Sequence, residues 1–321
     1  NILFVVIGND IVGLGHVYNT LLVANDILNH KITFLVDKDS KLAYDKISLK
    51  NYPVFIQESE NILDDIKKFN PDLVINDKLD TTLEYMQGLK KLSIKTLNFE
   101  DLGEGSKIAD LVINAIYPEK QIIKNHYFGH DYFILRDEFI YSETKDNKEK
   151  IEGILISFGG VDPNNYTKKV IETIYEYCMQ HAIKINVITG FGYKKYDSID
   201  NYKNINIYKN VANISKYMLE ADLIFTSAGR TTYEVASIGV PTIVLAQNDR
   251  ELTHFFANSE FGFLNLGLGY NISDEEIYKN FIELIDSYEN RKYMSELMLK
   301  FDLKSGRKRV NKLIQNLMED I

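Results

Sequence analysis

Thr226-Ser-Ala-Gly-Arg-Thr-Thr-Tyr-Glu234, followed by Val-Ala-Ser-Ile-Gly-Val-Pro-Thr-Ile-Val-Leu245, is the stretch from which we predict the fold. The apolar run at 222–225 predicts a short strand directly before it, and the small and hydroxyl residues predict a loop. A new helix is predicted from Thr231, and Gly239-Val-Pro241 ends it and begins the next buried strand. The loop therefore lies at the carboxyl end of a strand, where α/β proteins bind their ligands.

The composition of this loop suits an anion such as a phosphate. Gly229 allows close approach of the backbone, and the start of the helix presents backbone N–H groups. Further donors are the side chains of Thr226, Ser227, Arg230, Thr231 and Thr232. Glu234 lies one turn into the helix, where a carboxylate can accept from a pair of ribose hydroxyls. The other interpretation is an ordinary corner, with Thr231 as the N-cap and Glu234 completing a capping box.

Length and composition limit the classes of protein to which the chain can belong. Its 321 residues exceed the usual size of one core, which predicts two domains. The formal net charge of −9 argues against nucleic acid or an anionic membrane as a partner. The single cysteine, Cys178, excludes an intrachain disulfide and a Cys-rich metal site, so we expect a cytoplasmic protein.

The start of the chain predicts a strand and not a targeting segment. Asn1-Ile-Leu-Phe-Val-Val-Ile7 is too short for a signal peptide and lacks its basic flank. No apolar run approaches the roughly 20 residues that span a bilayer, so we expect no integral membrane segment. The sequence does not begin with Met, which we interpret as a trimmed chain or as one part of a longer protein.

Short apolar strands alternate with amphipathic helices along both halves of the chain. We predict strands at 2–7, 32–36, 73–75, 94–99, 109–114, 154–158, 183–188, 205–208, 223–225 and 242–246. We predict helices at 16–28, 62–69, 81–92, 164–181, 214–219, 231–237 and 274–288, and two more within 290–321, separated near 305–306. Such alternation predicts parallel sheets with helices on both faces.

The polar stretch at 141–150 predicts a linker between two domains. We therefore expect an N-terminal domain at 1–140 and a C-terminal domain at 151–321, and we leave open whether the last helix packs back on the N-terminal domain. The predicted fold class is α/β, with two doubly wound, Rossmann-like domains that face each other across a cleft.

A second glycine turn, Gly13-Leu-Gly-His16, follows the first strand and precedes the first helix. It invites a dinucleotide-binding interpretation with Asp37 on a ribose, but Tyr18 occupies the position of the third glycine. His16 lies near the positive end of the helix, which disfavours its protonated form and lets it act as a base. The alternative is a histidine that caps the helix or packs locally.

A third turn, Gly159-Gly160-Val-Asp-Pro163, predicts a phosphate-accepting loop in the second half. No Gly-x4-Gly-Lys-Ser/Thr motif occurs in the chain, so we exclude a P-loop nucleotidase. His126 and His130 have the spacing of two metal ligands, but the segment lacks a glutamate and contains Gly129. We predict that this segment is a loop before a strand.

Taken together, three of these motifs resemble the PseG/SpsG family. They are Gly-x-Gly-His16, Ile-Ser-Phe-Gly-Gly-Val-Asp-Pro163 and Ser-Ala-Gly-Arg-Thr-Thr-Tyr-Glu-Val-Ala-Ser-Ile-Gly-Val-Pro241, and the segments at 97–101, 109–114 and 135–139 extend the likeness over most of the chain. The family comprises nucleotide-sugar hydrolases of pseudaminic acid synthesis and spore-coat polysaccharide proteins, and it is related to the MurG glycosyltransferases. The resemblance implies a GT-B fold, a UDP-sugar substrate bound mainly by the C-terminal domain through its uridine, and neither a metal nor another cofactor.

The resemblance also implies roles for individual residues. His16 matches the catalytic histidine and Glu234 the glutamate that binds the ribose. Asp77, Glu100 and Asp101 are carboxylates at strand ends that can assist catalysis or cap helices, and we assign Asp77 to catalysis. We expect the diphosphate at Gly15, Gly159, Gly160, Thr226, Ser227, Gly229, Arg230, Thr231 and Thr232, and the sugar at Asn19, Asn248, Glu251 and His254.

Departures from the family pattern gather at the sugar end of the site. Asn19 replaces an arginine, 247–254 replaces an Asn-Gln pair, and 76–79 replaces an Asp-x-Tyr motif. Three functions therefore stay open: an inverting UDP-sugar hydrolase for a nonulosonic acid or surface polysaccharide, an inverting transferase that uses a UDP- or CMP-sugar, and a non-catalytic nucleotide-sugar-binding module. An NAD dehydrogenase is a more distant alternative. Fusion to, or association with, an enzyme of a CMP-sugar pathway is also left open.

Overall fold

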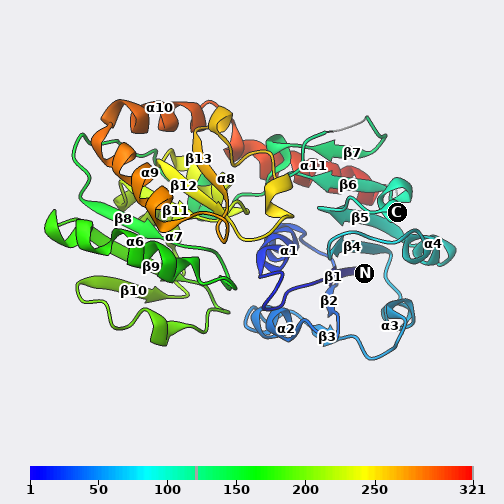
Figure 1. The fold of residues 1–321 in the computed structure, drawn as a ribbon. Helices are drawn as coiled ribbons and strands as arrows, with labels where there is room; N and C mark the ends of the chain where they lie inside the picture. The colour runs from blue at the N-terminus through cyan, green and yellow to red at the C-terminus, as the bar shows by residue number, and fades with distance from the viewer. Residues whose placement is uncertain (120–121, 320–321) are drawn as a thin grey trace. The chain divides into compact units, whose positions relative to one another are not determined.

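The computed structural model describes residues 1–119 and 122–319, and the chain divides into two compact units (Figure 1). Unit 1 comprises Asn1–Ile134 and Ser305–Ile321, and unit 2 comprises Leu135–Lys304. Each unit has its own parallel sheet.

The sheet of unit 1 has the strand order β3-β2-β1-β4-β5-β6-β7. Its strands are β1 (Ile2–Val6), β2 (Ile32–Val36), β3 (Val54–Ile56), β4 (Leu73–Asp77), β5 (Lys95–Phe99), β6 (Leu111–Asn114) and β7 (His126–Phe128). Its helices are α1 (Gly15–Asp26), α2 (Lys41–Ser48), α3 (Ile62–Phe69), α4 (Leu83–Lys91) and α11 (Gly306–Glu319). Every residue of β1 and β4 is buried, as expected for central strands covered on both faces.

The sheet of unit 2 has the strand order β10-β9-β8-β11-β12-β13. Its strands are β8 (Gly153–Ile156), β9 (Lys184–Thr189), β10 (Ile205–Lys209), β11 (Leu223–Thr226), β12 (Thr242–Ala246) and β13 (Phe263–Leu268). Its helices are α5 (Asp137–Ile140), α6 (Tyr166–Gln180), α7 (Ile214–Glu220), α8 (Thr231–Ile238), α9 (Asp274–Asp286) and α10 (Tyr288–Met298). Cys178 of α6 and Phe281 of α9 belong to one buried apolar cluster.

Both sheets have a point at which the strand order reverses. In unit 1 the chain moves outward from β1 to β3 and then returns to place β4 on the other side of β1. In unit 2 it moves from β8 to β10 and returns to place β11 on the other side of β8. The loops that follow the two central strands diverge there, which makes the carboxyl edge at this point the usual binding position of a doubly wound sheet.

The structure confirms the predicted strands and helices within a few residues and adds elements that the sequence pattern did not indicate. The additional elements are α2, β3, β7, α5 and β13. The prediction of a loop at 126–130 was wrong, because His126 begins β7 and pairs with Val112 of β6. Ser273 caps α9, since its Oγ accepts from the Glu276 N–H at 3.1 Å.

The stretch at 141–150, for which we predicted a linker, contains no helix or strand but lies within unit 2. Lys145 Nζ lies 2.9 Å from Asp222 Oδ1, and both side chains are buried. Arg291 is also buried, and its guanidinium donates to the carbonyls of Lys148 and Glu149. These contacts fix the polar stretch to the body of unit 2.

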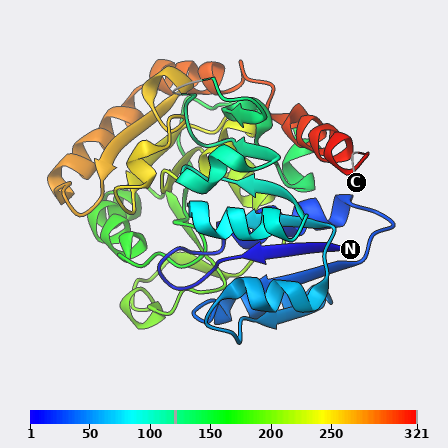
Figure 2. The ribbon, with the colours of Figure 1, turned by 90° about the vertical axis from the view of Figure 1, so that its right-hand side faces the viewer.

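The last helix, α11, belongs to unit 1 although it comes from the far end of the chain (red in Figure 2). Arg307 at its start forms an ion pair with Asp26 at the end of α1, with Nη2 at 2.5 Å from Oδ1. Asn311 donates to the same carboxylate at 2.6 Å. Helix α11 is therefore part of unit 1, although it follows all of unit 2 in the sequence.

Candidate active site

His16 of unit 1 lies against a buried carboxylate. Its Nδ1 is 2.5 Å from Asp77 Oδ1, and Asp77 is completely buried whereas 14% of the His16 side chain is exposed. The neutral imidazole then carries its proton on Nδ1 and donates it to Asp77, which leaves Nε2 as the basic nitrogen. His16 neither caps α1 nor packs only against its own turn, so that alternative is wrong, and the catalytic role of His16 stays a prediction.

The topology of the sheet explains how these two residues meet. His16 is the second residue of α1, which follows β1, and Asp77 is the last residue of β4. β1 and β4 are neighbours, with Val6 opposite Asp77. The pair therefore lies at the carboxyl edge where the strand order of unit 1 reverses.

Asn19 lies beneath this pair and not on an accessible surface. Its Nδ2 donates to Asp77 Oδ2 at 2.7 Å, and only 2% of Asn19 is exposed. The predicted sugar contact is thus corrected: one turn after His16, Asn19 holds the second oxygen of Asp77. Gly15, which we expected near a diphosphate, is the first residue of α1.

The other two carboxylates at strand ends have different surroundings. Asp101 accepts from the backbone N–H and the hydroxyl of Thr81, and from the amide of Asn98. These bonds tie the loop after β4 to the loop after β5. Glu100 is 2% exposed and has a positive φ of 52°. Asp77 is thus the carboxylate that bonds to the histidine.

In unit 2 the predicted anion-binding loop follows β11 and leads into α8. Gly229, Arg230 and Thr231 are partly exposed, whereas Thr226, Ser227 and Thr232 are buried. The hydroxyl of Thr232 donates to the Gly229 carbonyl at 2.8 Å, and Thr226 Oγ1 has no hydrogen-bond partner among the described residues. The accessible donors of the loop are thus fewer than the sequence predicted.

Helix α8 begins without a side-chain cap among the residues that the structure describes. Thr231 is its first residue and Arg230 occupies the N-cap, so the alternative of a Thr231 cap with a capping box is wrong. Glu234 instead accepts from Arg136 Nε at 2.8 Å, and Arg136 also contacts Glu138. An uncapped helix start presents backbone donors and the positive end of the helix dipole to an anion.

The turn after β8 differs from the loop after β11, because it leads into a helix whose first N–H groups bond to a side chain. Gly159 has a φ of 79°, which only glycine adopts easily. The carboxylate of Asp162 accepts from the N–H groups of Tyr166 and Thr167 at 2.9 Å each and thereby caps α6. An anion at Gly159 and Gly160 therefore cannot use the start of α6, and the predicted phosphate contact there reduces to the two glycines.

Glu251 and His254 contact the loop after β11 from the segment that follows β12. Glu251 Oε2 accepts from the Ala228 N–H at 3.2 Å, and His254 Nδ1 lies 2.8 Å from the Ala228 carbonyl oxygen. Asn248 is exposed, and its Oδ1 accepts from the Glu251 N–H at 3.0 Å. Glu251 and His254 thus hold the loop, and their predicted sugar contacts stay predictions.

Sequence reasoning missed two contributors to this edge of unit 2. Gly190 lies against the Gly159–Gly160 turn, because a methyl group on it would stand 2.4 Å from Gly160 Cα. Gln247 donates from Nε2 to Asp162 Oδ1 at 2.9 Å and joins the loops after β8 and β12. Two glycines after a strand, Gly190 and Gly192, were the available signal for the first, and the position of Gln247 at the start of 247–254 was the signal for the second.

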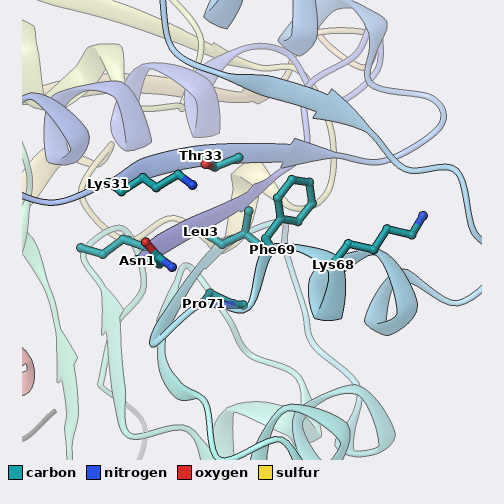
Figure 3. Close-up of a pocket in the computed structure, with 8 residues that line it drawn as sticks. Asn1, Leu3, Lys31, Thr33, Lys68, Phe69 and Pro71 are labelled. Atoms are coloured by element: carbon teal, nitrogen blue, oxygen red, sulfur yellow. The ribbon is translucent and has the colours of Figure 1, made fainter.

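A separate pocket lies at the amino ends of β1 and β2, away from the residues described above (Figure 3). It is lined by Asn1, Ile2, Leu3, Lys31, Thr33, Lys68, Phe69 and Pro71. It contains none of the predicted site residues. Among the described residues, no group of His, Cys, Asp and Glu side chains is arranged to hold a metal ion.

Comparisons with known proteins give a family for the second half of the chain and a fold for nearly its whole length. The model of the glycosyltransferase family 28 C-terminal domain matches residues 154–314. The crystal structure of Acinetobacter baumannii MurG has a TM-score of 0.68 and 16% identity, over 98% of this chain and 99% of that chain. The fold and these matches define the class: proteins with the GT-B fold that carry a glycosyltransferase family 28 C-terminal domain.

Three relatives specify more closely which proteins the chain resembles. An uncharacterized protein of Methanocaldococcus jannaschii is 32% identical over 74% of this chain, and the match spans 54% of that relative. The spore coat polysaccharide biosynthesis protein SpsG of Bacillus subtilis is 26% identical over 87% of both chains. The UDP-2,4-diacetamido-2,4,6-trideoxy-beta-L-altropyranose hydrolase of Campylobacter jejuni is 24% identical over 70% of this chain and 83% of that enzyme. The chain belongs to glycosyltransferase family 28 through its C-terminal domain, and within that family it is PseG/SpsG-like and related to MurG.

No helix among the described residues has the length and apolar character to cross a bilayer.

Proposed function

We propose that the chain hydrolyses a UDP-sugar at its anomeric carbon with inversion, in the synthesis of a nonulosonic acid or a surface polysaccharide. The observation that carries this proposal is the pairing of His16 with the fully buried Asp77. A general base must be held in one tautomer and one orientation, and Asp77 supplies both. The names of the Bacillus and Campylobacter relatives support the substrate class.

The proposed step uses His16 Nε2 as the base. A water molecule donates a proton to Nε2 while its oxygen forms the bond to C1 of the sugar. The bond between C1 and the diphosphate oxygen breaks, and UDP leaves with the electron pair. Asp77 stabilises the imidazolium that forms and afterwards returns it to the same tautomer.

Unit 2 would supply the nucleotide-binding groups. The uncapped start of α8 and the partly exposed Gly229, Arg230 and Thr231 provide donors for the departing diphosphate. Preorganised donors of this kind contribute about 3 kcal/mol each to transition-state stabilisation in acyl-transfer enzymes. Glu234, already oriented by Arg136, would accept from the ribose hydroxyls.

A second candidate is an inverting transferase, which the match to a glycosyltransferase domain favours. The same base would then act on an acceptor hydroxyl in place of water. Without acceptor, a hydrolase releases UDP and free sugar, whereas a transferase binds UDP-sugar without turnover. A non-catalytic binding module behaves like the transferase in this assay but stays inactive with every acceptor.

The test follows nucleotide and free sugar by NMR, with panels of UDP- and CMP-sugars and no acceptor. The variants are His16→Ala and, as a matched control, His30→Ala, because His30 is exposed in the connection between α1 and β2. We expect the wild-type protein to release UDP from a UDP-sugar. His16→Ala should lower the rate of release at least about 100-fold, and His30→Ala should leave it unchanged. Release that is independent of His16 would overturn the assignment of the base, and absence of any nucleotide binding would overturn the nucleotide-sugar function.

A further inference from the structure

The loop after β11 and the loop after β12 are joined by one carboxyl group. Glu251 Oε2 accepts from the Gln247 N–H at 2.8 Å and from the Ala228 N–H at 3.2 Å. The Ser227 side chain is also hydrogen-bonded to this carboxyl. Two of the residues that Glu251 bonds, Ser227 and Ala228, therefore lie directly before Gly229, where the proposed function places the diphosphate.

The carboxyl also lies close beneath Gly229. A methyl group on that glycine would stand 3.2 Å from Glu251 Oε1. A carboxylate at this place repels a phosphate on the loop, whereas a neutral carboxyl does not. One oxygen serves both backbone N–H groups, so the other is available for a proton without loss of those bonds.

We propose that Glu251 is the positioning residue of this loop, and that the loop binds a nucleoside diphosphate together with a proton on Glu251. The inference rests on the proposed function, because it takes the ligand to be a nucleoside diphosphate. The proton comes from solvent and resides on the oxygen that does not accept from Ala228 and Gln247. The Glu251 O–H then donates to Ser227 Oγ, and the Ser227 O–H, which donates to the ionised carboxylate in the absence of ligand, is released toward the phosphate.

The electrostatic surroundings agree with this proton uptake. Burial raises the pKa of Glu251 from its ordinary value of 4.5 to about 7, against the lowering by hydrogen bonds from Gln247, Ala228 and Ser227. The other charged or titratable groups on the segments packed here are Asp162, Tyr166, Arg230, Asp249, Arg250 and His254. They are unchanged in a Glu251 variant, so a comparison of pH profiles isolates the contribution of Glu251.

The experiment measures UDP binding by isothermal titration calorimetry between pH 6 and 8.5, in buffers of different ionisation enthalpy. Glu251→Gln keeps an oxygen that accepts from both backbone N–H groups but takes up no proton. Glu251→Ala removes the acceptor. Asp249→Asn is the matched control, because it removes an exposed carboxylate from the same loop.

We expect the wild-type protein to take up close to one proton per UDP above pH 7, with affinity falling up to about tenfold per pH unit relative to Glu251→Gln. Glu251→Ala should weaken UDP binding about tenfold or more at every pH, since Ala228 and Gln247 lose their shared acceptor. Asp249→Asn should behave like the wild type. The ionisation of UDP itself is common to all variants and cancels in the comparison.

Identical pH profiles and proton uptake in the wild type and Glu251→Gln would overturn the proton coupling. Wild-type affinity in Glu251→Ala would overturn the positioning role. A wild-type protein that binds no nucleoside diphosphate would overturn the proposed function instead. In that case amide hydrogen exchange at Ala228 and Gln247 still decides the positioning role: faster exchange in Glu251→Ala supports it, and unchanged exchange refutes it. Should Glu251→Ala fail to fold, Glu251→Gln alone decides the proton coupling.

Discussion

His16 and Asp77 form a pair in which the carboxylate determines the tautomer and the orientation of the imidazole. The carboxylate is fully buried and also accepts from Asn19, so it has one fixed position. A fixed acceptor at Nδ1 favours the neutral tautomer in which Nε2 carries no proton. This arrangement differs from a surface histidine such as His30, whose Nδ1 contacts a backbone carbonyl of its own turn, that of Leu28.

Asp77→Asn should therefore lower kcat more than it changes KM. The amide can present its N–H₂ to Nδ1, which favours the tautomer with the proton on Nε2 and removes the base. We expect a loss of about 10²- to 10⁴-fold in kcat for release of nucleotide from a UDP-sugar, measured at saturating substrate. Asp64→Asn, which changes an exposed carboxylate on α3, is the control. Equal kcat values in Asp77→Asn and the wild type would contradict a base that depends on Asp77.

Individual side chains show which contacts the sequence predicts and which depend on packing. The motifs predicted site roles for His16, Asp77 and the loop at 226–232, because polar residues and glycines at the carboxyl ends of strands suit ligand binding, and these roles stay predictions. The same reasoning assigned Asn19, Glu251 and His254 to the sugar, and the structure gives each of them a polar neighbour in its own unit. Sequence position indicated that these side chains lie near the site, but their direction depends on packing.

Among the secondary-structure elements, the strands that the sequence did not indicate all lie at the edges of the sheets. β3 and β7 are the two edges of the unit 1 sheet, and β13 is an edge of the unit 2 sheet. An edge strand is covered less completely, so it needs no continuous apolar run: none of the three residues in β3 or in β7 is fully buried. Central strands such as β1, β4 and β12 were found because all their residues are buried.

Gly190 tests the contact between two loops of unit 2. In Gly190→Ala the added methyl group would lie 2.4 Å from Gly160 Cα and 2.5 Å from the Gly159 oxygen, and backbone atoms cannot move aside cheaply. We expect a loss of about 1–3 kcal/mol in the free energy of unfolding, together with weaker UDP binding. Urea denaturation and calorimetry measure the two effects.

Gly153→Ala is the matched control for this substitution, because its methyl group would meet its nearest neighbour, the Glu220 oxygen, at 3.7 Å. Alanine in a strand interior also costs less conformational entropy than glycine. Gly153→Ala should thus be neutral or slightly stabilising. If Gly190→Ala were equally neutral, the close packing of Gly190 on the Gly159–Gly160 turn would be refuted.

At the scale of the whole molecule, the chain leaves unit 1 and returns to it. α11 buries Val310, Ile314 and Leu317 and places Arg307 against Asp26 of α1. Removal of 305–321 would expose the surface that these side chains cover. At about 2 kcal/mol for each apolar side chain, we expect unit 1 to lose on the order of 5 kcal/mol.

Limited proteolysis and urea denaturation of the truncated chain test this expectation, with cleavage sites in unit 1 appearing first. Lys312→Ala, an exposed position on the same helix, is the control and should unfold like the wild type. A truncated chain with an unchanged denaturation midpoint would show that α11 contributes nothing to unit 1.

The pH dependence of stability is a property of the whole chain to which Glu251 makes a separable contribution. Its pKa rises from 4.5 in the unfolded chain to about 7 in the folded protein, because burial disfavours the charged form. The folded state therefore binds more protons than the unfolded state between these values, and stability falls as pH rises through this window. The stabilisation is fully present below pH 4.5 and is lost above about pH 7. The difference between the two pKa values corresponds to about 3 kcal/mol.

We expect the difference in unfolding free energy between Glu251→Gln and the wild type to grow by up to about 3 kcal/mol from pH 5 to pH 8, measured by urea denaturation. A difference that does not change with pH would show that the Glu251 carboxyl titrates alike in the folded and unfolded chains.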